Sequence, residues 1–253
     1  MKGIKTILFM IVITIIFISA LASINELSEE RVIQNAKIDR YKSILYAFDI
    51  FPGNVQEQDL GLTSTTNDIP WQQDQILQNI EKQIRTIKVP VTSEQVQLLK
   101  NSFLAVKDSV EIFVRTNEAR EVVAYGFPLR GKGLWGTITA FGVISADLNK
   151  MVGIDFTEQV ETPGLGARIT EIEFKYFFRN LDLSGFEDQS PTPPIILVKN
   201  KDKTNLDEST NSFQAITGAT QTVDGVLKMV NSDLRFYIEV IRGNEELIKK
   251  LVG

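Results

Sequence analysis

Apolar and polar residues follow three kinds of pattern along this chain, and the first is an unbroken apolar run near the N-terminus. Residues Ile7–Ile24 carry no charge and would span about 27 Å as a helix, close to the roughly 30 Å hydrocarbon core of a bilayer. Lys2 and Lys5 precede the run and the acidic segment 25–31 follows it, which predicts a cytoplasmic N-terminus with the remaining chain outside the cytoplasm. A cleaved signal peptide is the alternative, because Ala20–Ala22 has the spacing of a cleavage site, but the run is longer than a usual signal-peptide core.

The second pattern is helical spacing of apolar residues in the next part of the chain, residues 25–108. It predicts that the membrane helix continues to about residue 51 and is followed by a loop over 51–70. Further helices are expected over 71–89 and over 93–106, the latter with Thr92 as its N-cap. We interpret residues 25–108 as a membrane-proximal helical region.

The third pattern begins at residue 109, where short β-branched and aromatic runs are separated by polar turns. It predicts an antiparallel meander of four strands, then a helix, a strand, a polar surface loop and a long amphipathic helix beginning at Gln221. The strands are expected over 110–116, 121–129, 133–145 and 151–159, the helix over 167–181, the next strand over 193–199 and the loop over 200–212. The expected fold class is α+β. Residues 1–24 form a cytoplasmic tip and single transmembrane helix, and residues 109–253 form an extracytoplasmic domain with an antiparallel sheet packed by helices.

Composition removes several classes of function. The 253 residues include no cysteine and no histidine, which excludes disulfides, thiolate or histidine catalysis and the usual zinc, haem and iron–sulfur sites. A net charge of -5 gives no basic surface for nucleic acid. We expect neither a catalytic side chain nor a metal site, so any redox chemistry requires an organic cofactor.

The segment Ala215–Val226 places threonine hydroxyls and a Gly-Ala pair directly before the final helix. The unpaired N–H groups and positive dipole end of a helix start stabilise a phosphate. Gly218 permits close backbone approach, and Ala219 adds almost no bulk. These residues alone leave two interpretations open: Thr217 or Thr220 is an ordinary N-cap, or the turn holds a phosphate.

A second stretch, Glu161–Ile169, follows a predicted strand and opens a predicted helix. Its two glycines flank Leu165, and Pro163 restricts the turn. This stretch is either a simple turn or a tight loop that cradles a phosphate or the edge of a flat ring.

These two stretches and a third motif occur in an order that resembles a known family. The motifs are GKGLWG at 131–136, EQVETPGLG at 158–166 and ITGATQT at 216–222. In this order, and behind a membrane anchor, they are similar to the FMN-binding subunits of two respiratory complexes: the C subunit of the sodium-translocating NADH:quinone reductase and the G subunit of the Rnf complex. The resemblance covers the anchor and about residues 109–243.

The resemblance implies that FMN is bound covalently, through a phosphoester between its phosphate and Thr220. Because no histidine or thiol can activate the hydroxyl, a separate flavin transferase would have to install the bond. The family often has Asp six residues before the attached threonine, where this chain has Gln214.

The resemblance also implies a set of flavin-lining residues around Thr220. A buried core position is the alternative for Trp135, and an exposed position at a helix start is the alternative for Arg168. We interpret the carboxylates of Asp155, Glu158 and Glu161 as solvated rather than as acid–base groups. The lining set is Thr217, Gly218, Ala219, Glu161, Thr162, Gly164, Leu165, Gly166, Leu134, Trp135 and Arg168.

The function that the resemblance implies is one-electron transfer within a membrane complex, with other membrane subunits and lipid as partners. The quinone reductase is favoured over the Rnf complex by GKGLWG, by Glu158-Gln159 and by the length of the chain. A membrane-anchored module that binds a diffusible ligand without redox work is the alternative of another class.

Overall fold

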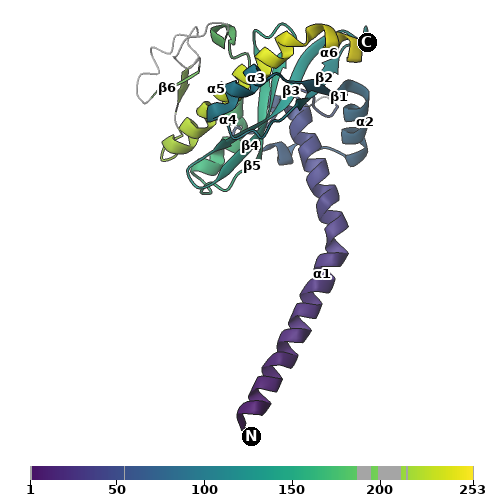
Figure 1. The fold of residues 1–253 in the computed structure, drawn as a ribbon, viewed down its shortest axis with the longest axis vertical. Helices are drawn as coiled ribbons and strands as arrows, with labels where there is room; N and C mark the ends of the chain where they lie inside the picture. Colours follow the sequence, from purple (N-terminus) through teal and green to yellow (C-terminus); the bar gives the residue numbers. More distant parts are fainter. Residues whose placement is uncertain (1, 54, 187–194, 199–211, 215, 253) are drawn as a thin grey trace. The chain divides into compact units, whose positions relative to one another are not determined.

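The computed structural model describes residues 2–53, 55–186, 195–198, 212–214 and 216–252, and the chain divides into two compact units, Met1–Arg40 and Tyr41–Gly253. Helix α1 (Lys2–Ala47) forms the first unit, and its last residues belong to the second. Most of its large apolar side chains between Ile4 and Ile24 are exposed. Among the described residues, α1 is the one helix long and apolar enough to cross a membrane. The predicted continuation of the apolar helix is confirmed as far as Ala47 (Figure 1).

A five-stranded antiparallel sheet in the order β1-β2-β3-β4-β5 forms the centre of the second unit. The predicted four-strand meander and the α+β class are confirmed. Gly133–Gly136, expected at the start of a strand, instead form the turn between β3 and β4. The strands are β1 (Ile84–Pro90), β2 (Ser109–Thr116), β3 (Val122–Lys132), β4 (Thr137–Ser145) and β5 (Met151–Glu158).

Strand β1 corrects the helix predicted over 71–89. Helix α2 (Gln73–Gln83) ends where the chain becomes extended, and β1 pairs with β2 from Ile84 opposite Arg115 to Pro90 opposite Ser109. The hydrogen bonds to β2 and the burial of Ile87 and Val89 therefore favour a strand over the predicted helix in residues 84–90. The region expected to be helical and membrane-proximal shares its sheet with residues 109–158.

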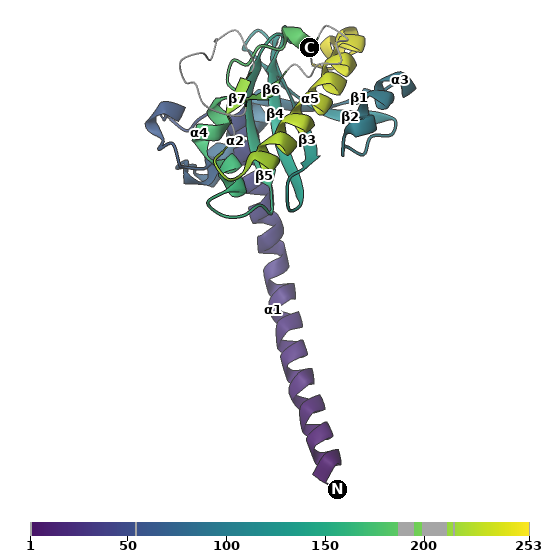
Figure 2. The ribbon, with the colours of Figure 1, turned by 90° about the vertical axis from the view of Figure 1, so that its left-hand side faces the viewer.

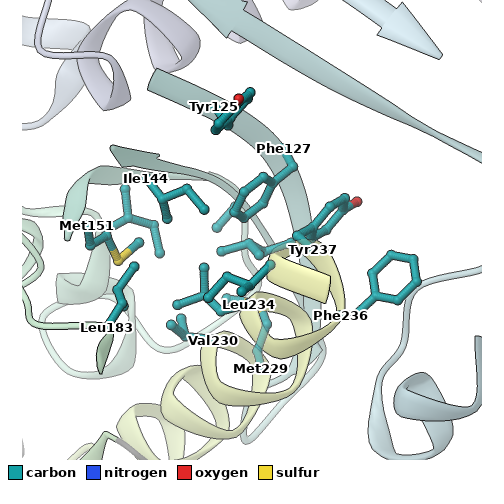
Figure 3. Packing of buried hydrophobic residues seen from close by; sticks show 14 of the residues in the cluster. Tyr125, Phe127, Ile144, Met151, Leu183, Met229, Val230, Leu234, Phe236 and Tyr237 are labelled. Atoms are coloured by element: carbon teal, nitrogen blue, oxygen red, sulfur yellow. The ribbon is translucent and has the colours of Figure 1, made fainter. Parts of the chain in front are cut away.

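Helix α5 (Thr220–Gly243) lies across one face of the sheet (Figures 1 and 2). Tyr237 stacks on Phe127 of β3 with ring centroids 4.1 Å apart (Figure 3). The helix approaches β3 closely, because a Cβ added at Gly225 would lie 2.3 Å from the carbonyl oxygen of Lys132. The amphipathic helix predicted here is thus confirmed, and its start is held against the end of β3.

The other face of the sheet is covered by the end of α1 and the segments that follow it. Residues Ser43–Phe48 are buried. Phe48 packs against Phe141 of β4 and over Gly126 of β3, and Tyr46 joins a smaller apolar cluster with Ile69 and Ile172. The last turns of α1 are therefore part of the core of the second unit.

The remaining elements are short. The helix predicted over 93–106 ends early, although its Thr92 cap is confirmed by a 3.2 Å bond from Gln95 N to Thr92 Oγ1. The helix predicted over 167–181 is interrupted at Glu171, whose backbone is extended. The polar loop predicted over 200–212 lies outside the described residues except for Ser212. Strands β6 (Ile196–Val198) and β7 (Ser212–Gln214) pair in parallel. The other short elements of the described chain are η1 (Glu57–Asp59), η2 (Thr66–Asp68), α3 (Ser93–Gln97), η3 (Leu98–Asn101), η4 (Gly166–Thr170), α4 (Ile172–Tyr176), η5 (Ser184–Phe186) and α6 (Glu245–Val252).

Candidate functional site

The turn before α5 has the geometry of an uncapped helix start. Ala219 N donates a 2.9 Å hydrogen bond to Ile216 O, and Gly218 has φ +79. The N-cap residue is Ala219, and it makes no side-chain cap hydrogen bond. The interpretation of Thr217 or Thr220 as an N-cap is therefore wrong. The first turn also carries no acidic residue, so its N–H groups can receive an anion.

The threonines of this turn lie at different depths. Thr217 is exposed, Thr220 is half-buried in the first position of α5, and Thr222 is 1% exposed. Ala219 is also buried. Of the two threonines in the first turn of α5, Thr220 is therefore the one that is partly exposed.

The stretch Glu161–Ile169 forms a second turn, which contacts the first. Thr162 O accepts hydrogen bonds of 3.1 Å from both Leu165 N and Ala167 N, and Gly164 adopts φ +75. A Cβ added at Gly218 would lie 3.0 Å from Leu165 Cδ2. The two motifs, about fifty residues apart in sequence, are neighbours in the fold.

Glu161 joins all three sequence motifs. Its side chain is buried; Oε1 accepts a 2.9 Å hydrogen bond from Trp135 N, and Oε2 accepts a 2.5 Å bond from Thr222 Oγ1. Burial raises the pKa of Glu161, but the bonds from Thr222 and from the backbone N–H groups around Trp135 outweigh it and hold the pKa below its ordinary value. The interpretation of Glu161 as a solvated loop carboxylate is wrong.

Two motif glycines leave room for this carboxylate. A Cβ added at Gly133 would lie 2.5 Å from Glu161 Oε1, and one added at Gly166 would lie 2.7 Å from Thr222 Oγ1 and 2.9 Å from Glu161 Oε2. Gly166 is buried. The absence of a side chain at Gly166 gives the Glu161–Thr222 pair its space, and the expected place of Gly166 beside the flavin stays a prediction.

The turn between β3 and β4 presents two apolar side chains to solvent. Gly133 N donates a 2.8 Å bond to Gly136 O and closes the turn. Leu134 is 45% exposed and Trp135 is 69% exposed, so the alternative of a core position for Trp135 is wrong. Because Trp135 N donates to Glu161 Oε1, the turn that carries Leu134 and Trp135 lies beside the turn formed by Glu161–Ile169.

An open pocket of about 160 Å³ lies beside the turn that precedes α5. Ile216 and Thr217 line it together with Phe174, Phe177, Glu171, Glu173 and Arg168. Arg168 donates to Glu171 Oε2 at 3.0 Å and to Glu173 Oε2 at 3.3 Å. Its charge is thus balanced by two carboxylates. Phe177 is not among the residues that the sequence predicts at the site, and nothing in its own sequence neighbourhood indicates the pocket.

Asp155 and Glu158 lie in different surroundings from Glu161. Asp155 is buried and forms a 2.8 Å ion pair with Lys175, so its interpretation as a solvated strand residue is wrong. Glu158 is exposed, as expected. Gln214 ends β7.

Comparison with known proteins finds a family match over the part of the chain that contains these turns. Residues 133–235 match the FMN-binding domain family. The chain is 33% identical over 129 residues to the C subunit of the Na(+)-translocating NADH-quinone reductase of Chlamydia pneumoniae, covering 47% of this chain and 40% of that protein. It is 30% identical over 128 residues to the same subunit of Pasteurella multocida, covering 51% and 45%. The chain thus aligns with less than half the length of these relatives.

Solved structures share the fold. The crystal structure of the Na(+)-translocating NADH-quinone reductase C subunit from Parabacteroides distasonis superposes with a TM-score of 0.56 at 19% identity, covering 83% of this chain and 96% of that chain. Shewanella oneidensis NqrC gives a TM-score of 0.55 at 18% identity, covering 79% and 94%.

Proposed function

We propose that this chain is an FMN-carrying electron-transfer subunit of a sodium-translocating NADH:quinone reductase, with the flavin joined through a phosphoester to Thr220. One observation carries the proposal: within the residues that match the FMN-binding domain family, α5 begins at Thr220 without a side-chain cap. The similarity to relatives from the quinone reductase supports the choice of complex.

The residues at the start of α5 fit a phosphate. The uncapped N–H groups and the helix dipole favour the negative charge. Gly218 and Ala219 keep side chains away from the approach. Thr217 is exposed beside them and can donate a hydrogen bond to a phosphate oxygen.

The surroundings explain why a covalent bond is useful. Leu134, Trp135 and Leu165 are at least 42% exposed and offer apolar surface for a flavin ring. The pocket of about 160 Å³ beside the turn is smaller than the roughly 300–1,000 Å³ of sites that bury a ligand. Contacts alone would therefore hold FMN weakly, whereas an ester bond keeps it in an open position that favours electron exchange.

A transferase must supply the chemistry of attachment, because no histidine or cysteine is present. The Thr220 hydroxyl oxygen would attack the flavin-side phosphorus of a flavin dinucleotide, and the phosphoanhydride bond would break to release a nucleoside monophosphate. The hydroxyl proton passes to a base of the transferase. Bound FMN then supplies reversible electron transfer, and this chain's residues hold and orient it.

The proposed setting is the cytoplasmic membrane. The apolar run of α1 would cross the bilayer once with a cytoplasmic N-terminus, which would put the flavin domain outside the cytoplasm. Its partners would be the other membrane subunits of the complex, with lipid around α1. The G subunit of an Rnf complex is the nearest alternative, and the genes beside this one, or copurifying subunits, distinguish the two.

The test is co-expression of the full chain with a flavin transferase. The denatured protein is expected to show flavin fluorescence and a mass increase of one FMN less water, and Thr220→Ala is expected to lose both. Thr86→Ala, at an exposed position on β1, is the matched control and should keep the mass increase. A wild-type chain without bound flavin would instead favour a membrane-anchored module for a diffusible ligand.

A further inference from the structure

We infer that Glu161 and Thr222 are positioning residues for flavin attachment, and that they act by fixing the first turn of α5 and so the direction of the Thr220 hydroxyl. The inference rests on the proposed function, because it concerns the same threonine. Glu161 is 5% exposed and Thr222 is 1% exposed. Thr222 Oγ1 donates a 2.5 Å hydrogen bond to Glu161 Oε2, and this contact is buried.

The spacing of the two threonines explains how a buried contact directs an exposed hydroxyl. Successive residues of an α-helix are rotated by about 100°. Thr220 and Thr222 are therefore about 200° apart around the axis of α5, on nearly opposite sides. Holding Thr222 toward the interior turns Thr220 toward the surface, in agreement with its intermediate exposure.

The contact between Glu161 and Thr222 takes the place of a helix cap. A side chain at the N-cap position normally fixes the first turn of a helix, but this position is Ala219, which offers none. Thr222, in the third position of α5, is instead held by the carboxylate of Glu161, which belongs to the turn formed by Glu161–Ile169. The N–H groups that a cap would occupy stay available to an anion.

Glu161 is itself held from a second direction. Its other oxygen accepts the N–H of Trp135, which belongs to the turn between β3 and β4. The space for this arrangement exists only because Gly133 and Gly166 have no side chains. The Glu161 carboxylate therefore connects the start of α5 to the turn between β3 and β4 and fixes its position relative to the sheet.

The experiment measures the initial rate of covalent flavin attachment in the full chain, by mass and by fluorescence of the denatured protein, together with the melting temperature. Thr222→Val keeps the shape and removes the hydroxyl, and we expect attachment to slow by about 10- to 100-fold, the size of effect that follows a misplaced reacting group. Thr222→Ser restores the hydroxyl and is expected to recover most of the rate. Val240→Ala, at a fully buried position near the other end of α5, is the control for lost stability and should attach flavin at the wild-type rate.

A double variant tests whether the two residues act through one contact. Glu161→Ala removes the carboxylate that accepts the Thr222 hydroxyl, so it should also slow attachment. Adding Thr222→Val to it should cause no further loss.

Two results would overturn the inference alone: an unchanged rate in Thr222→Val, or rates that follow the melting temperature across all variants, Val240→Ala included. A wild-type chain that accepts no flavin would overturn the proposed function as well.

Discussion

Lys175 Nζ lies 2.8 Å from Asp155 Oδ1, and both side chains are almost completely shielded from solvent. The ammonium group also donates to Thr66 Oγ1 at 2.6 Å and lies 4.0 Å from the centre of the Tyr46 ring. Burial lowers the pKa of Lys175, while the charge of Asp155 opposes the shift. The ion pair connects α4 to β5, and its ammonium group lies next to Tyr46 at the end of α1.

Lys175→Met is expected to lower the free energy of unfolding by about 3 kcal/mol or more, because it leaves the Asp155 carboxylate buried without a counter-charge. Lys175→Met combined with Asp155→Leu should be more stable than the single variant, since both charges are then absent. Denaturant unfolding of the two variants checks this. A double variant less stable than Lys175→Met would contradict it.

Asp233 predicts a dependence of stability on pH. It is fully buried on α5, and burial raises its pKa to about 6, although bonds from Ser102 Oγ and Arg130 N oppose the shift. Because the folded state holds the proton more tightly, stability from this group is present below about pH 4 and is lost as pH rises through 6. A difference of about two pKa units corresponds to about 3 kcal/mol.

Asp233→Asn should remove this loss, because an amide can accept from Arg130 N and donate to Ser102 Oγ without becoming charged. Unfolding free energies at about pH 4 and about pH 7 test the change. Equal pH dependence in Asp233→Asn and in the wild type would show that other groups cause it.

Gly225→Ala should destabilise the second unit by about 1–3 kcal/mol, because its Cβ would lie 2.3 Å from Lys132 O and would force α5 away from β3. Gly243→Ala is the matched control in the same helix. Its Cβ would meet only Gln95 Nε2, at 3.0 Å, and alanine favours helix, so its melting temperature should be unchanged or higher. A neutral Gly225→Ala would mean that α5 can shift at no cost.

Trp135→Ala should change the free energy of unfolding by less than about 0.5 kcal/mol, because the indole is 69% exposed. If the indole contacts the attached flavin, its removal should raise the fluorescence of the folded flavoprotein. Phe103→Ala, at another exposed aromatic position, should leave the fluorescence unchanged. Loss of the native fold in Trp135→Ala would contradict this assignment.

The sequence predicts the elements whose patterns are local. Alternation predicted β2 to β5, and helical spacing predicted α5 to within one residue of its start. Strand β1 was missed because Ile76, Ile80, Ile84 and Ile87 keep helical spacing, and only pairing with β2 makes the second half extended.

The buried polar contacts could not be predicted in the same way. Glu161 and Thr222 are 61 residues apart, and Asp155 and Lys175 are 20 apart. Nothing in the residues next to a carboxylate tells whether a distant partner will bury it. The glycines of the motif were visible, but the need for space around Glu161 was not.

The burial of residues 43–48 has a consequence for the order of events during synthesis. Ala47 O faces Gly153 of β5 so closely that a Cβ there would lie 2.7 Å away, and about a hundred residues separate the two. At roughly 5–20 residues per second, the segment that follows the apolar run waits about 5 to 20 seconds for the strands that cover it. During that interval Phe48 is without Phe141 and Gly126, on which it packs in the folded protein, so a nascent-chain chaperone would find an exposed aromatic side chain there.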